Sequence, residues 1–165
     1  MSKIAIVYGS STGATESVAE KIKASFDDAT LFNADSVSVD DLKPYDFLIF
    51  GASTTGVGDL QDDWEILLPK IEKMDFSGKK VAIFGLGDSA SFSTSFAGGM
   101  YVIYKALKGK AEFVGFVSTD GYTFDESDAV VDGKFVGLAL DEDNEYNETD
   151  ARIAAWVEDL KKYLN

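Results

Sequence analysis

Short apolar runs alternate with amphipathic segments along the whole chain. The runs occupy residues 4–7, 29–33, 47–50, 81–84, 113–117 and 135–140. Mostly continuous apolar residues, rather than alternating ones, are typical of strands that are buried on both faces. The segments between the runs have apolar residues at helical spacing. The pattern therefore predicts an open parallel sheet with right-handed helical crossovers on both faces.

Amphipathic stretches predict the positions of the helices. Helical spacing is clearest for Val18, Ala19, Ile22 and Phe26, for Trp64, Leu67, Leu68 and Ile71, and for Ile153, Trp156, Val157, Leu160 and Leu164. A further helix is expected over residues 94–107, and one helical turn around residues 40–42. We expect Pro69 to kink or end the helix that contains it, and Thr149 or Asp150 to cap the last helix.

Composition excludes several kinds of chemistry for residues 1–165, which we expect to form a single domain. The chain has no Cys and no His, which excludes disulfides, thiol or Ser–His catalysis and the usual zinc sites. Its net charge of -14 argues against nucleic acid and anionic membrane surfaces as partners. No apolar run reaches transmembrane length, and the N-terminus leads directly into a strand without a signal peptide, so we expect a cytoplasmic protein.

Three strand-to-helix loops are expected at the carboxyl edge of the sheet, where open α/β sheets bind their ligands. They comprise residues 10–15, 53–60 and 85–92. The first loop consists of the small or hydroxylated residues Ser10, Ser11, Thr12, Gly13, Ala14 and Thr15. Backbone N–H groups and the helix dipole at such a loop favour a bound phosphate, and the hydroxyls can donate further hydrogen bonds.

Positive charge is absent around all three loops. Residues 4–20, 47–69 and 81–104 contain no Lys and no Arg. A Walker-type phosphate loop requires a Lys, so its absence argues against nucleotide hydrolysis. Residues 85–90 match the dinucleotide pattern G-x-G-x-x-G/A, but the match is a weak signal because it follows the fourth strand. A receiver domain is excluded, because Gly9-Ser10 stands where that domain needs acidic residues.

Aromatic residues in and after the third loop indicate a flat ligand. Phe92 lies in a Gly- and Ser-rich loop, where it is better placed to stack on a planar ring than to enter the core. Phe96 has two interpretations, contact with the ligand or core packing where a helix begins. Asp88 is interpreted as a turn or N-cap residue that can also hydrogen-bond to the polar edge of the ligand.

In these loops the chain resembles the flavodoxins, which are FMN-binding electron carriers. The resemblance covers essentially the whole chain and implies an α/β fold of the flavodoxin-like type. Its architecture would be a three-layer arrangement around an open five-stranded parallel sheet of order 2-1-3-4-5. Residues 120–144 resemble the long-chain subgroup, in which an inserted loop splits the fifth strand. The inserted loop would lie within residues 118–134.

The resemblance implies FMN as the cofactor, with no metal and no catalytic residue. The FMN-binding residues would be Ser10, Ser11, Thr12, Gly13, Ala14, Thr15, Thr54, Thr55, Gly56, Leu86, Gly87, Asp88, Phe92, Phe96 and Asp143. Thr55 stands where many members stack a Trp on the flavin, which should weaken binding or leave a gap beside the ring. Phe92 stands where a Tyr is usual. Trp64 lies too far along the chain to replace the missing Trp and is expected in the core.

The resemblance further implies a carrier that moves single electrons between redox enzymes. Full reduction makes the flavin ring anionic, and without nearby cations that charge is destabilised, so we expect a low potential. Gly56 gives the second loop room to turn a peptide group toward the flavin. We expect a monomer whose redox partners are ferredoxin/flavodoxin-type reductases or 2-oxoacid oxidoreductases. They would dock on an acidic rim formed by Asp59, Asp62, Asp63 and Glu65.

Two functions of other classes remain open at this point. One is a quinone reductase with the same fold, for which the chain has no obvious substrate residues beyond the small Thr55. The other is a binding module that has lost its cofactor, against which the intact loop of residues 10–15 argues.

Overall fold

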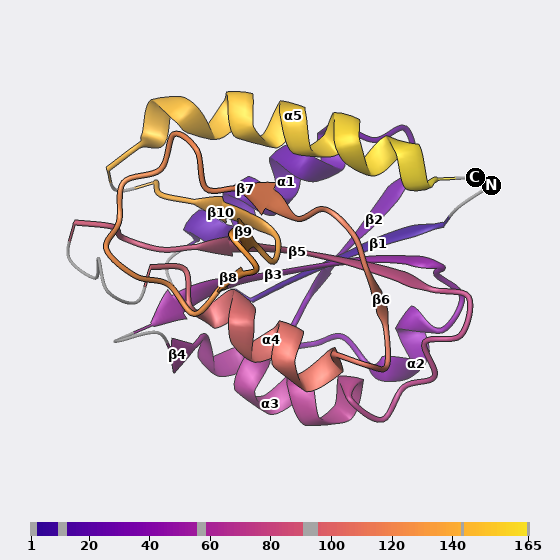
Figure 1. The fold of residues 1–165 in the computed structure, drawn as a ribbon. Coiled ribbons are helices and arrows are strands. Elements are labelled where there is room, and N and C mark those ends of the chain that lie inside the picture. The colour runs from indigo at the N-terminus through magenta and orange to yellow at the C-terminus, as the bar shows by residue number, and fades with distance from the viewer. Residues whose placement is uncertain (1–2, 10–12, 56–58, 91–95, 143, 165) are drawn as a thin grey trace.

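The main sheet has the predicted strand order. The computed structural model describes residues 3–9, 13–55, 59–90, 96–142 and 144–164. The parallel strands are β1 (Ile4–Gly9), β2 (Ala29–Asn33), β3 (Phe47–Thr55), β5 (Lys80–Leu86) and β10 (Leu138–Leu140). They lie side by side in the order β2-β1-β3-β5-β10 (Figure 1). Counted along the chain, this is the order 2-1-3-4-5, so the predicted flavodoxin-like topology is confirmed.

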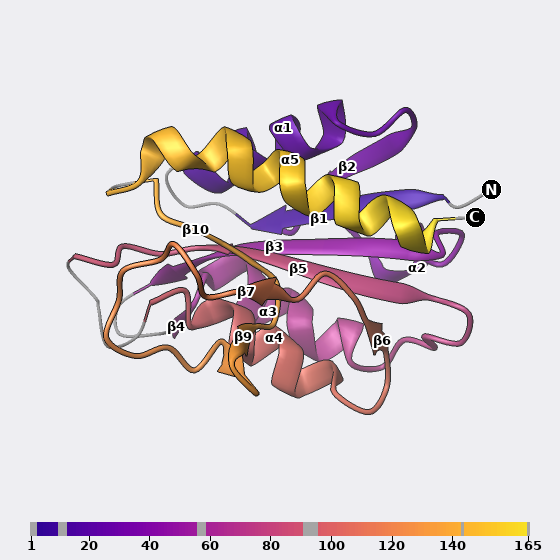
Figure 2. The ribbon, with the colours of Figure 1, turned by 45° about the horizontal axis from the view of Figure 1, so that its top comes forward.

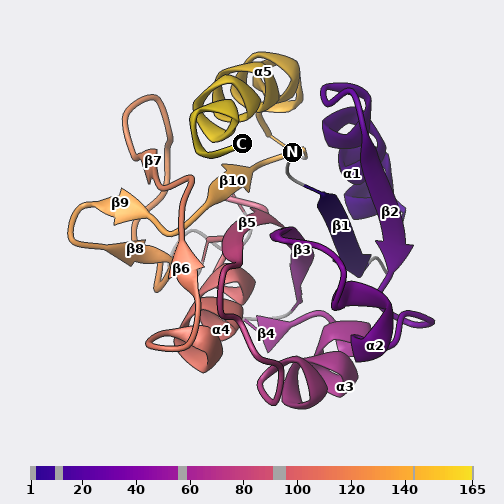
Figure 3. The same cartoon turned by 90° about the vertical axis from the view of Figure 1, so that its right-hand side faces the viewer.

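Helices cover both faces of this sheet, which gives three layers (Figure 3). One face carries α1 (Ala14–Ala24) and α5 (Thr149–Leu160), and the other carries α2 (Val39–Leu42), α3 (Asp62–Ile71) and α4 (Gly99–Leu107). The predicted apolar stripes are buried, except that Leu164 lies beyond α5 and is half-buried. Trp64 is a core residue as predicted, and its indole N–H donates to the carbonyl of Gly51 at 2.7 Å.

The fifth strand is split by an inserted segment, as the resemblance implied. Its first part, β6 (Glu112–Phe113), pairs with the start of β5, and its second part, β10, pairs with the end of β5. Between them, β7 (Val117–Ser118), β8 (Val130–Val131) and β9 (Lys134–Phe135) form a small antiparallel sheet of order β7-β9-β8. We call residues 114–137 the insert (Figure 1).

The two final predicted strands were therefore wrong in their boundaries. Residues 113–117 do not form one strand, because Gly115 has a φ of 83° and turns the chain away from β5. Residues 135–140 are divided in the same way between β9 and β10. The irregular stretch 118–134 is not structureless, since it contributes to the small sheet of the insert.

Other boundaries also differ from the predictions. β3 continues to Thr55 and pairs antiparallel with β4 (Asp59–Leu60), although residues 53–60 were predicted as a loop. α4 begins at Gly99 rather than near residue 94, because Ala97 has a left-handed φ of 53°. α3 continues through Pro69 for two more residues and ends at Ile71.

Two short 3-10 turns flank the last helix. η1 (Tyr146–Glu148) precedes α5, and η2 (Lys161–Tyr163) follows it. The predicted cap was wrong, because the N-cap position is Glu148 and no side-chain cap hydrogen bond is made there. Among the described residues, no helix combines the length and the apolar character that crossing a bilayer requires.

Tyr122 and Arg152 fasten the insert to the rest of the molecule. The Tyr122 hydroxyl donates to the carbonyl of Ala139 at 2.7 Å. The Arg152 guanidinium stacks 3.8 Å from the centre of the Tyr122 ring and donates to the carbonyl of Gly121 at 3.0 Å. Burial raises the pKa of Tyr122 to about 12 against the opposing effect of Arg152.

We expect Tyr122 to make the protein less stable at high pH. A folded-state pKa above the ordinary value of 10.0 means that this contribution is complete below pH 10 and is lost as the pH rises toward 12. Over that interval the free energy of unfolding should fall by up to about 1.4 kcal/mol per pH unit through this group. Urea unfolding of the wild type and of Tyr122→Phe between pH 9 and pH 11.5 measures the difference. Parallel curves for the two proteins would contradict the assignment.

Candidate functional site at the carboxyl edge of the sheet

The carboxyl ends of β1, β3 and β5 meet at one edge of the sheet. Gly9 pairs with Ala52 at the end of β1, and Ser53 pairs with Leu86 at the end of β5. All three strands lead toward the left-hand edge of Figure 2. The three predicted loops therefore start from neighbouring positions, as an open parallel sheet requires.

The first loop ends at the N-terminus of α1. Gly13 is the N-cap of α1, has a φ of 91° and makes no side-chain cap hydrogen bond. Thr15 in the first turn is only 1% exposed. Its Oγ1 is buried and makes no hydrogen bond with any residue that the structure describes. A buried hydroxyl without an acceptor is costly, so its position in this turn fits a bound anion such as a phosphate.

Tyr8 holds α1 against the strands just below this loop. Its hydroxyl donates to Glu16 Oε2 at 2.9 Å and accepts from Asn33 Nδ2 at 3.4 Å. Burial and then the adjoining Glu16 carboxylate raise the pKa of Tyr8. The contacts join β1, the first turn of α1 and the end of β2. They fix the direction in which the N-terminus of α1 points.

The second loop is anchored through Thr54. The Thr54 Oγ1 accepts a hydrogen bond from the backbone N–H of Gly99 at 3.0 Å, which joins the end of β3 to the start of α4. A Cβ at Gly99 would lie 3.1 Å from this oxygen, so the approach is close. The predicted FMN contacts of the Thr55 side chain and of Gly56 lie outside the described part and stay predictions.

The third loop is held by backbone contacts that require a glycine. The Gly87 N–H donates to the carbonyl of Leu140 at 3.0 Å. A Cβ at Gly87 would lie 2.6 Å from the backbone nitrogen of Ala97, so a larger residue would push the loop outward. Asp88 Oδ1 accepts from the Ala90 N–H at 3.2 Å, which supports its interpretation as a turn residue.

A buried carboxylate, which the sequence analysis missed, joins this loop to the end of the fifth strand. Asp141 is 0% exposed and accepts from the backbone N–H and hydroxyl of Ser89. It also accepts from the backbone N–H and side-chain amide of Asn144, at 3.1 and 2.9 Å. The same amide donates to Asp88 Oδ1 at 2.8 Å. The sequence could not distinguish Asp141 from the other acids of residues 141–145, because burial depends on the facing loop.

The side chain of Phe96 packs beneath the insert. It is 1% exposed and stacks on Phe124, with ring centres 5.5 Å apart, and contacts Phe135 edge-on. These contacts support core packing beneath the insert, which was one of its two interpretations. They do not test contact with a cofactor. The other predicted residues Ser10, Ser11, Thr12, Phe92 and Asp143 lie outside the described residues.

Acidic side chains lie on the first turns of α3, next to this edge. Asp62 and Glu65 are exposed, and Asp63 is half-buried and accepts from Gln61 Nε2 at 3.0 Å. Ile66 stands among them with 67% of its surface exposed. The side chain of Asp59 lies outside the described part of the structure. Within the described ranges, no group of three or more acidic side chains is arranged to hold a metal ion.

Comparison with known proteins identifies the family. The family model described as flavodoxin matches residues 6–156. Flavodoxin from Nostoc sp. PCC 7120 is 45% identical over 162 residues, which cover 96% of this chain and 95% of that protein. Flavodoxin 1 from Azotobacter vinelandii is 45% identical over 169 residues and covers 98% and 97%, respectively.

Solved structures agree with these sequence relatives. The Fusobacterium nucleatum flavodoxin, crystallised with flavin mononucleotide, has a TM-score of 0.94 at 37% identity and covers 100% of both chains. Its K13G mutant, also solved with flavin mononucleotide, has the same TM-score at 38% identity. Since both the family model and the relatives extend over nearly the whole sequence, the chain belongs to the flavodoxin family.

Proposed function

We propose that this chain binds FMN at the carboxyl edge of its sheet and works as a low-potential one-electron carrier. As a flavodoxin it is an electron-transfer protein rather than an enzyme that converts a substrate. The observation that carries the cofactor assignment is the buried, unpartnered hydroxyl of Thr15, among described residues, at the N-terminus of α1. Bound FMN supplies the redox chemistry, and the protein supplies binding and electrostatics.

Each loop would hold a different part of the cofactor. The phosphate would lie against residues 10–15, where the Thr15 hydroxyl and the N–H groups of the first turn of α1 can donate to it. The ring would lie between residues 54–56 and residues 86–88, with Phe92 stacked on it and Asp143 close by. Because Gly87 has no side chain, the backbone of the third loop can lie close to Ala97. This close approach would leave room for the flavin ring above the loop. The Asp141 hydrogen bonds hold this third loop in place before the cofactor arrives.

The charges around the site support the low potential. Residues 4–20, 47–69 and 81–104 contain no Lys and no Arg, and the chain carries a net charge of -14. The carboxylates of Asp88 and Asp141 are held at the base of the third loop. Transfer of a second electron to FMN adds negative charge at this site. The three segments provide no cation to balance that charge, so the second reduction step is unfavourable.

A redox titration tests the proposal. The purified protein is expected to take up FMN, and the potential of the second one-electron step is expected to lie below that of free FMN in the same buffer. Uptake of FMN with a second potential equal to or above the free value would contradict the low-potential role. Turnover of a quinone with NAD(P)H by the protein alone would favour the quinone reductase instead.

Redox partners would dock on the acidic turns of α3 around the exposed Ile66. We infer a monomer in the cytoplasm whose partners are of the flavodoxin/ferredoxin reductase or 2-oxoacid oxidoreductase type. Asp62, Asp63 and Glu65 would attract a basic surface, and Ile66 would supply the apolar contact at its centre.

The rate of electron transfer to such a partner should fall as salt rises. Exposed charges attract over about 10 Å at 0.1 M salt, and higher ionic strength shortens this range. Asp62→Asn and Glu65→Gln are each expected to slow transfer at low salt about two- to fivefold, through the loss of steering. Asp27→Asn, an exposed acid just before the start of β2, is the matched control. Stopped-flow rates that do not respond to salt, or an equal effect of Asp27→Asn, would contradict docking at this surface.

A further inference from the structure

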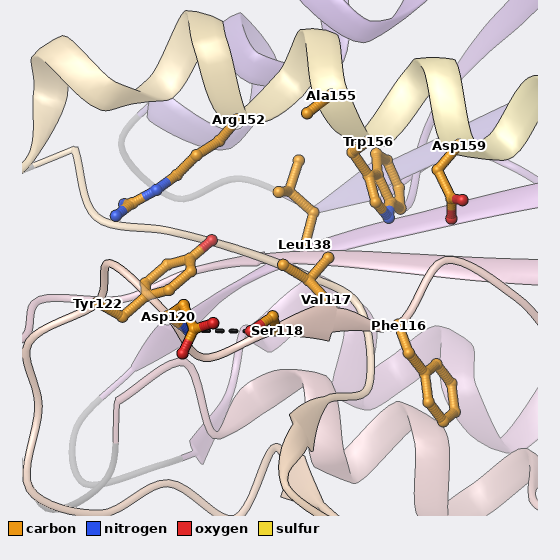
Figure 4. A pocket seen from close by; sticks show the side chains of 10 residues that line it. All are labelled: Phe116, Val117, Ser118, Asp120, Tyr122, Leu138, Arg152, Ala155, Trp156 and Asp159. Carbon is orange, nitrogen blue, oxygen red and sulfur yellow. Dashed lines mark hydrogen bonds between the residues drawn. The ribbon is translucent and has the colours of Figure 1, made fainter.

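A pocket separates α5 from the insert, away from the contacts that the proposed FMN site uses. Its volume is about 360 Å³, which lies within the range of small-molecule sites. One wall is a single face of α5, with side chains at positions 152, 155, 156 and 159 (Figure 4). The opposite wall is residues 116–122 of the insert, and Leu138 of β10 lies between the walls.

The middle of the pocket is apolar and aromatic. Trp156 lines it, and its indole N–H is already satisfied by the carbonyl of Gly115 at 2.8 Å. Val117 and Leu138 lie beside the indole (Figure 4). Phe116 is 38% exposed at the rim and packs edge-on against Tyr104. Trp156 and Leu138 form the floor of the pocket with only 3% and 1% of their surface exposed, and the more open apolar surface is that of Val117 and Phe116.

The Arg152 end of the pocket is closed and electrically balanced. The guanidinium of Arg152 donates to Glu145 Oε1 at 3.0 Å and to the carbonyl of Gly121 at 3.0 Å. One of its faces is covered by the ring of Tyr122. The Arg152 charge is thus neutralised by Glu145, and its side chain serves as a wall rather than as an anion site.

The Asp159 end carries a negative charge. Asp159 lies seven residues beyond Arg152 on α5, which is about 10 Å along the helix axis. Its side chain is 40% exposed and pairs with Lys162 at 3.3 Å, and Lys162 is itself 72% exposed. Such a surface pair stabilises little and can be exchanged for another cation. Asp120, a second acid, is exposed and lines the pocket beside Tyr122, at the other end from Asp159 (Figure 4).

We propose that this pocket binds a small aromatic cation, specifically an arylalkyl ammonium. The aromatic ring would lie against Val117 and Phe116, above the floor that Trp156 and Leu138 form, and the ammonium group would face Asp159. The net charge of -14 concentrates cations near the protein and disfavours the corresponding anions. The proposal does not depend on bound FMN.

Titration with 2-phenylethylammonium, followed by nuclear magnetic resonance of the two indole N–H groups, tests this inference. The Trp156 signal is expected to shift, whereas the signal of Trp64 should not, since Trp64 is buried on the opposite face of the sheet. The affinity should be the same with and without FMN. Neutral 2-phenylethanol and anionic 3-phenylpropionate are expected to bind at least fivefold more weakly.

Three variants give the test its controls. Asp159→Asn is expected to weaken binding of the ammonium at least fivefold, whereas Glu158→Gln removes an equal charge from an exposed neighbour outside the pocket and should change nothing. Ala155→Leu fills the mouth from an exposed helix position and should abolish the shift. The proposal would be overturned by an unshifted Trp156 signal, by equal affinity for the alcohol, or by full affinity of Asp159→Asn.

Discussion

Replacing Thr15 by valine is expected to weaken FMN binding about 10- to 100-fold. The Thr15 Oγ1 is buried in the first turn of α1 and makes no hydrogen bond to the described residues, so a phosphate there would be its acceptor. A hydrogen bond to a charged group contributes about 1.5–3 kcal/mol, and each 1.4 kcal/mol changes the dissociation constant tenfold. Titration of the apoprotein with FMN, followed by quenching of flavin fluorescence, measures the change.

Thr149→Val is the matched control for this prediction. Thr149 lies at the start of α5, is 1% exposed, and its Oγ1 likewise makes no hydrogen bond to a described residue. Both replacements remove a buried, unsatisfied hydroxyl, so both apoproteins should be as stable as the wild type or slightly more stable. Only Thr15→Val should lose affinity. Undiminished FMN binding by Thr15→Val would mean that the phosphate is not held at this helix N-terminus.

Gly137→Ala is expected to destabilise the protein by about 3 kcal/mol, because a methyl group does not fit between β10 and β5. A Cβ at Gly137 would lie 1.9 Å from the carbonyl oxygen of Ile83, which is a backbone atom in the middle of β5. Accommodating the methyl group would push the entry to β10 away from the sheet. For a chain of this length the melting temperature should fall by about 6–12 °C. Thermal unfolding followed by circular dichroism measures this shift.

Gly133→Ala separates crowding from backbone strain. Gly133 has a φ of 83°, and a Cβ there would meet no atom within 4 Å. The replacement should therefore cost only the left-handed backbone penalty of about 1–2 kcal/mol. If Gly137→Ala were no more destabilising than Gly133→Ala, the close approach of residue 137 to β5 would be contradicted.

Much of the fold could be predicted from the sequence, because burial on both faces leaves a clear local signal. The strand at residues 29–33, the helical faces of Val18 and Trp64, and the order of strands and helices agree with the structure. The predicted ends of strands and helices were wrong where the backbone of one residue interrupts the regular element. Gly115 turns the chain out of β6, and the left-handed backbone of Ala97 delays the start of α4.

For the candidate site, the clearest local signal in the sequence lies in the first loop. Small hydroxylated residues between a strand and a helix are a local signal for a phosphate, and Thr15 of this loop is buried in the first turn of α1. For Phe96 the sequence left two interpretations open, ligand contact and core packing. The packing of its ring against Phe124 and Phe135 depends on the distant insert, which local sequence does not reveal.

The sequence by itself determined the layered parallel sheet, the carboxyl edge from which the three loops start, and the absence of cations from the three loop segments. These depend on apolar periodicity, on the handedness of crossovers and on composition, which are all local or additive properties. Only the tertiary structure decided that Asp141 is a buried anchor, that Gly137 admits no side chain, and that a pocket lies beside Trp156. Each of these depends on a strand, loop or helix far away in the chain, and sequence spacing does not encode such contacts.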